Sequence, residues 1–134
     1  MDKINTIKFY QNLGKLFYAI AVSDKVVREE ELHKLQETVK SVWLTSNLVQ
    51  DIDKPEAEHS IINTFKWLNR DDEYDAETCF NSFISFKKDN EQLFTKELNS
   101  LILKTANIIA SSFSGKNKSE LIMLAKLNLE LNKT

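Results

Sequence analysis

The sequence contains few residues that interrupt regular structure, with only two glycines and one proline among 134 residues. An all-β fold needs turn-forming residues at every strand junction, and this chain does not have enough of them. The hydrophobic fraction of 42% argues against intrinsic disorder. Because the length also suits one domain, we expect a single all-α domain spanning residues 1–134.

A large excess of positive charge is also absent. The net charge is −2 and the isoelectric point is about 5.7, so nucleic-acid binding is not expected. No stretch reaches the roughly 20 apolar residues that span a bilayer, and the first residues do not follow the pattern of a signal peptide. We therefore expect a cytoplasmic protein without a transmembrane segment, for which any peripheral association with a membrane would require a partner protein.

The chain lacks recognisable catalytic motifs. It has no glycine-rich phosphate loop, no GxSxG elbow, no HExxH and no Cys–His pair at a recognisable spacing. Its one cysteine, Cys79, cannot form an intrachain disulfide and lies at helical spacing from Phe83, which predicts a buried and unreactive thiol. We expect a protein that is not an enzyme.

Apolar residues recur at steps of three and four along the chain, and this spacing predicts a compact bundle of about six helices. The expected organisation is a helical hairpin over residues 5–47, two inserted helices over 54–69 and 76–88, and a second hairpin over 91–131. The inward row of the last helix is predicted to be Leu121, Leu124, Leu127 and Leu131, with Asn128 at the edge of the core.

Individual residues refine this outline. Gly14 lies inside the first helix, where glycine costs about 1 kcal/mol relative to alanine, so another helix is expected to approach closely there. Asp75 is predicted to cap the fourth helix, and Asp89 with Gln92 has the spacing of a capping box for the fifth. The tryptophans are expected mainly in the core, but Trp67 falls outside the main apolar row of the third helix, so an exposed contact residue is the alternative there.

The two predicted hairpins resemble each other. A shift of 89 residues superposes Ile20 on Ile109, Leu32 on Leu121 and Leu35 on Leu124, and amphipathic spacing shared by any two helical hairpins explains these matches. It also superposes Glu31 on Glu120, a match that amphipathic spacing does not explain. We therefore predict an internal duplication that yields two pseudo-symmetric hairpins.

The stretch from Ala21 to Leu32 resembles the motif of the TerB-like domains associated with tellurite resistance, which also occur next to co-chaperone modules. An apolar helix ends in Ala21-Val22-Ser23-Asp24, Val27 follows three residues after the aspartate, and Glu31 follows seven after it. The resemblance implies an all-helical fold, a proposed cation-binding acidic surface, a role in chemical stress, and no enzymatic activity. Lys25 stands where the family prefers glycine, and Phe113 stands at the aspartate position of the second copy.

The candidate functional site is the stretch from Asp24 to Glu31, which connects the first two helices and is here called the acidic joint. Carboxylates that end one helix and begin the next can converge, and several oxygens at one point suit Ca²⁺, Mg²⁺ or Mn²⁺. The candidate ligands are Asp24, Glu30 and Glu31, with Glu120 at the equivalent position of the second copy. Two alternatives stay open, because glutamates in a first turn also stabilise the helix dipole, and an acidic surface can dock a protein.

The expected function is therefore that of a binding domain, with a divalent cation as the one candidate cofactor and a protein as the unidentified partner. The alternative is a metal-independent interaction module, which includes a homodimer formed through an exposed apolar helix face.

Overall fold

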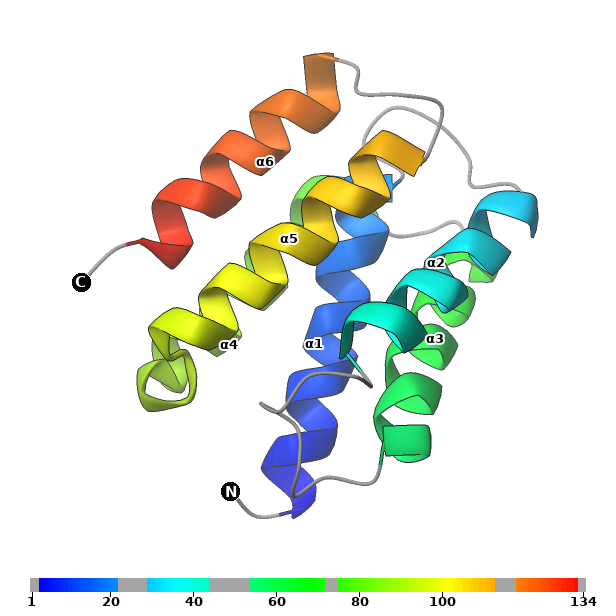
Figure 1. Ribbon diagram of the computed structural model, residues 1–134. Coiled ribbons are helices and arrows are strands. Elements are labelled where there is room, and N and C mark those ends of the chain that lie inside the picture. Colours follow the sequence, from blue (N-terminus) through cyan, green and yellow to red (C-terminus); the bar gives the residue numbers. More distant parts are fainter. Residues whose placement is uncertain (1–2, 22–28, 44–53, 72–74, 113–117, 133–134) are drawn as a thin grey trace.

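The computed structural model describes residues 3–21, 29–43, 54–71, 75–112 and 118–132, and these residues contain six α-helices and no strand (Figure 1). The helices are α1 (Lys3–Ala21), α2 (Glu29–Trp43), α3 (Lys54–Asp71), α4 (Ala76–Asp89), α5 (Lys96–Ser112) and α6 (Lys118–Leu131). A short 3-10 turn, η2 (Glu91–Leu93), separates α4 from α5. The predicted all-α bundle is confirmed. No helix in the described ranges is both long and apolar enough to cross a membrane.

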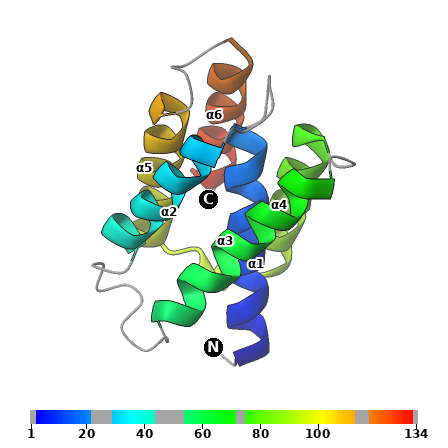
Figure 2. The same ribbon diagram turned by 90° about the vertical axis from the view of Figure 1, so that its right-hand side faces the viewer.

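α1 is the central helix of the bundle. α3 and α4 pack along it, and α5 and α6 also contact it (Figure 2). Every residue from Leu16 to Ala21 is buried, so this last third of α1 is covered on all sides. The sequence predicts a single apolar stripe here. The additional burial of Tyr18 arises from tertiary packing, since its ring meets that of Phe65 on α3 at 5.6 Å between centroids.

Gly14 of α1 faces α3. A Cβ atom added to Gly14 would lie 2.8 Å from the carbonyl oxygen of Ile61 and 2.8 Å from the Cβ atom of Thr64. Both distances are well below the usual separation of nonbonded atoms, so a side chain at this position would push the two helices apart. The prediction of a close helix approach at Gly14 is confirmed.

The packing partners differ between the two predicted hairpins. α5 and α6 pack side by side, as a hairpin requires (Figure 1). α2 instead makes its main contacts with α5 and α3, not with α1. Buried residues from all six helices nevertheless belong to one continuous hydrophobic core.

The start of α4 agrees with the sequence prediction. Asp75 is the N-cap, and its Oδ1 atom accepts a hydrogen bond of 2.6 Å from the backbone N–H of Thr78. This hydrogen bond lowers the pKa of Asp75, because the bond favours the charged carboxylate.

The predicted start of α5 is wrong. Asp89 ends α4 instead of capping the next helix, and α5 begins only at Lys96. Thr95 precedes it, and the Thr95 hydroxyl oxygen accepts a hydrogen bond of 3.1 Å from the Leu98 N–H. The intervening turn carries the ring of Phe94 into contact with Phe83, at 5.9 Å between centroids. Burial of this aromatic residue requires a bend that a continuous helix would not provide.

Lys87 is buried beside this bend, which the helical spacing does not predict. Its side chain is only 3% exposed, and its Nζ atom lies 3.5 Å from Oε1 of Glu91. The same ammonium group lies 5.9 Å from the centre of the Phe94 ring. The ion pair and the ring therefore compensate part of the cost of burying this lysine.

Candidate functional site

The acidic joint predicted from the sequence falls on residues that the structure does not describe in full. Asp24 lies outside the described residues. Glu30 and Glu31 belong to the first turn of α2, and Glu120 belongs to the first turn of α6, but their side chains lie outside the described part of the chain. No three histidine, cysteine or acidic side chains are grouped to hold a metal ion within that part. The cation site therefore stays a prediction.

Cys79 is buried on α4, as predicted. Desolvation raises the pKa of its thiol, and the positive charge of Lys15 on α1 opposes this effect only partly. The nucleophilic thiolate is therefore disfavoured at neutral pH, as expected for a structural cysteine.

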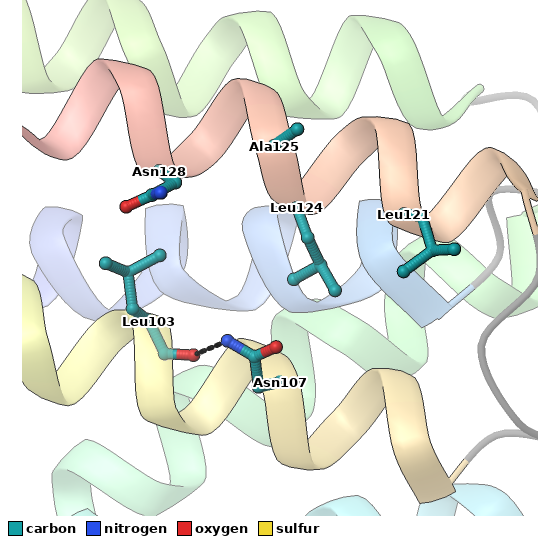
Figure 3. A pocket seen from close by; sticks show the side chains of 6 residues that line it. All are labelled: Leu103, Asn107, Leu121, Leu124, Ala125 and Asn128. Carbon is teal, nitrogen blue, oxygen red and sulfur yellow. Dashed lines mark hydrogen bonds between the residues drawn. The ribbon is translucent and has the colours of Figure 1, made fainter.

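A groove of about 320 Å³ runs between α5 and α6 and opens to solvent (Figure 3). Six side chains line it, two from α5 and four from α6: Leu103, Asn107, Leu121, Leu124, Ala125 and Asn128. These residues supply apolar surface and two amides, with no acid, base or nucleophile among them. The groove therefore offers apolar contacts together with amide hydrogen-bonding groups.

Both amides of the groove are hydrogen-bonded within their own helices. Nδ2 of Asn107 donates to the carbonyl oxygen of Leu103 at 2.9 Å (Figure 3). Oδ1 of Asn128 accepts a hydrogen bond of 2.6 Å from Nδ2 of Asn132. The groove therefore has a lining of mixed polarity, in which four of the six side chains are apolar and two are amides.

α6 exposes several apolar side chains to solvent. Leu121, Ile122 and Leu129 are 51%, 50% and 69% exposed, whereas Leu124 and Leu127 are buried. Ile122, Ala125 and Leu129 follow one another at steps of three and four residues, so they form one strip beside the groove. We call the groove residues together with Ile122 and Leu129 the α6 face.

The prediction that Leu121 points into the core is wrong. α6 makes its main contacts with α5 and α1 only, and these two neighbours cover a narrow arc of the helix. Leu121 lies just outside this arc and forms part of the groove wall. The sequence does contain a signal for this surface, because apolar residues occupy both the inward row of α6 and positions such as Ile122 and Leu129 outside it.

The two walls of the groove are held in a defined register. Nδ2 of Asn99, in the second turn of α5, donates a hydrogen bond of 2.9 Å to the carbonyl oxygen of Leu131 at the end of α6. The two helices therefore run antiparallel, with the start of α5 beside the end of α6 (Figure 1). This contact places the groove on a fixed helix pair.

Trp67 presents a second exposed apolar side chain, on α3. It is 45% exposed, which agrees with the alternative that it lies outside the core. A single exposed aromatic residue is common on protein surfaces, whereas the α6 face gathers several apolar side chains beside a groove.

Comparisons of the chain with models of protein families, with curated proteins and with solved structures find no match in any of the three. The resemblance to TerB-like domains therefore rests on the residues from Ala21 to Leu32 and on the repeat.

Proposed function

We propose that this chain is a helical, non-enzymatic binding domain that docks another protein on the α6 face. One observation carries the proposal: three large apolar side chains on a single helix are exposed by half or more, beside a groove whose walls combine apolar side chains with two amides. Soluble monomers rarely leave such a patch exposed unless a partner covers it.

The energetics of the α6 face suit docking. Fully burying one leucine or isoleucine side chain contributes about 1.5–3 kcal/mol, and Leu121, Ile122 and Leu129 each have at least half of their surface left to bury. The groove adds a concave surface that a ridge of apolar side chains from a partner helix can enter. The lining residues lack acid–base groups, which supports binding over catalysis at this surface.

Site-specific photocrosslinking in the native host tests this proposal. A photoreactive amino acid at position 125 or 129 is expected to give a covalent adduct of defined mass, whereas the same probe at the exposed Ser85 of α4 is expected to give none. The absence of an adduct from positions 125 and 129, or the same adduct from position 85, would refute docking at the α6 face.

Our second proposal is that the acidic joint binds a divalent cation. It follows from the resemblance to TerB-like domains, so it also proposes that the chain belongs to that family and acts in stress response. Glu31 and Glu120 are each the third residue of their helix, α2 and α6, which supports the equivalence expected of a repeat. Oxygen ligands from Asp24, Glu30 and Glu31 suit Ca²⁺, Mg²⁺ or Mn²⁺.

A thermal melt of metal-free protein tests the cation proposal. A bound cation stabilises the folded state, so Ca²⁺, Mg²⁺ or Mn²⁺ at millimolar concentration is expected to raise Tm. The rise should be lost in the variant that combines Asp24→Ala and Glu31→Ala. An unchanged Tm, or an equal rise in that variant, counts against a cation site.

A further inference from the structure

We infer that the protein docked on the α6 face is a second copy of this chain, paired antiparallel through α6 about a two-fold axis near Ala125. This inference rests on the proposed docking function and names the partner. The observations behind it are the order of large and small side chains along the strip of Ile122, Ala125 and Leu129, and the lack of charge on that strip.

The strip points away from the core. α6 lies at the edge of the bundle, where its main neighbours are α5 and α1 (Figure 1). At about 100° per residue, Ile122, Ala125 and Leu129 fall within an arc of about 60°. The buried residues Leu127 and Leu131 lie on the opposite side of the helix. The strip is therefore the part of α6 that its own bundle leaves uncovered.

The strip is complementary to its own reverse. It runs large, small, large, with Ala125 three residues after Ile122 and four residues before Leu129. When two copies of α6 pack antiparallel, Ala125 meets the same alanine of the second copy, and Ile122 of each copy meets Leu129 of the other. The small central side chain permits an interaxial distance of about 8 Å, the short end of the range for packed helices. A two-fold interface requires a patch that matches itself in this way.

Charge does not oppose this pairing. In the described residues 121–132 the charged side chains are Lys126 and Glu130, which lie about 100° and 140° around the helix from Ala125. They occupy one flank, one turn apart, and give it one charge of each sign. The flank towards the groove carries Leu121 and Asn128, which are uncharged. The strip gives a charged partner nothing to pair with, whereas it matches a second copy of itself.

The size of the contact sets the expected affinity. α6 has 14 residues and is therefore about 21 Å long. One helix of this length from each copy buries less than the roughly 1,600 Å² of a standard protein interface. The dimer is therefore expected to be weak, with a Kd in the micromolar range, and the assay must extend to several hundred micromolar protein.

Sedimentation velocity over this concentration range tests the inference, and a charge exchange at position 125 makes the test specific. Wild type is expected to shift from monomer to dimer. Ala125→Glu brings two carboxylates together at the axis and Ala125→Lys brings two ammonium groups together, so each variant alone should stay monomeric. An equimolar mixture of these two variants should dimerise again. Ser85→Glu, at an exposed position of α4, is the matched control and should dimerise as wild type does.

Cysteine substitutions test the orientation of the two helices. In the antiparallel pair, position 122 of one copy faces position 129 of the other, so a mixture of Ile122→Cys and Leu129→Cys should form disulfide-linked heterodimers under mild oxidation. Each variant alone should cross-link poorly, because its two cysteines are about 10 Å apart along the helix axis. Cys79 is buried and does not compete. Cross-linking that is stronger in the single variants than in the mixture would overturn the inferred arrangement.

Photocrosslinking at positions 125 and 129 separates this inference from the docking function on which it rests. An adduct with twice the mass of the chain supports both. A wild-type chain that stays monomeric at every concentration, with an adduct to a different protein, would overturn the inference and leave the docking function standing. The absence of both dimer and adduct would overturn both. A dimer that Ala125→Glu leaves intact would place the contact elsewhere and would also overturn the inference.

Discussion

Gly14→Ala is expected to destabilise the protein, although the same exchange in an isolated helix is stabilising. Alanine gains about 1 kcal/mol over glycine in a helix interior. Here the added Cβ would lie 2.8 Å from the Ile61 carbonyl oxygen and 2.8 Å from Thr64 Cβ, so α1 and α3 must separate. Overpacking of this kind costs about 1–3 kcal/mol, and contact with a backbone atom places the cost in the upper half of that range.

The expected net loss from Gly14→Ala is therefore about 1–2 kcal/mol, with helix propensity subtracted from the overpacking cost. Urea unfolding followed by circular dichroism measures it, and a lower midpoint with an unchanged slope would locate the effect in stability.

Two controls accompany this measurement. Gln11→Ala, at an exposed position of α1, should change stability by less than about 0.5 kcal/mol. Adding Thr64→Ala to Gly14→Ala should restore little, because the Ile61 carbonyl and the Cβ at position 64 both remain. A Gly14→Ala protein that is more stable than wild type would refute the close approach of α1 and α3.

The remaining predictions concern three further sites. Asp75→Ala should lower Tm at neutral pH, because the cap to Thr78 is lost. The hydrogen bond lowers the folded-state pKa of Asp75, so its stabilisation is present above the unfolded-state pKa and is lost as the pH falls through the folded-state value. A Tm difference that persists at the lowest pH would contradict this origin. Lys87→Met replaces the lysine by an apolar side chain that keeps its buried packing, so the free energy of unfolding measured in urea should change by less than about 1.5 kcal/mol. A loss of about 3 kcal/mol or more would show that the ion pair with Glu91 is essential. Leu127→Ala should lower the free energy of unfolding by about 2–5 kcal/mol, because Leu127 is fully buried. Leu129→Ala should lower it by less than about 0.5 kcal/mol, because Leu129 is 69% exposed. Similar losses in the two variants would refute the described orientation of α6.

Much of the fold can be predicted from local patterns. The three- and four-residue apolar spacing and the scarcity of glycine and proline are properties of the chain itself, and they predict six helices close to their observed bounds. Asp75 could be predicted as a cap because its hydrogen bond joins residues three apart. The start of α5 could not, because the position of Phe94 depends on rings from distant parts of the chain.

The candidate site was less predictable than the fold. The acidic joint stands out in the sequence because Asp24, Glu30 and Glu31 are close along the chain, and their role stays a prediction. The α6 face has a weaker signal, because a leucine such as Leu121 has the same periodicity whether it faces a core or a groove.

The sequence alone determined that the chain is helical and where most of its helices begin and end, and it predicted the close approach of another helix at Gly14. These features depend on interactions within a few residues, or on the absence of a side chain. Only the tertiary structure decided that α1 is buried on all sides from Leu16 to Ala21, that α2 packs on α5 and α3, and that Leu121, Ile122 and Leu129 remain exposed. The physical reason is that periodicity shows which side of a helix is apolar, whereas burial depends on how many neighbours pack around it.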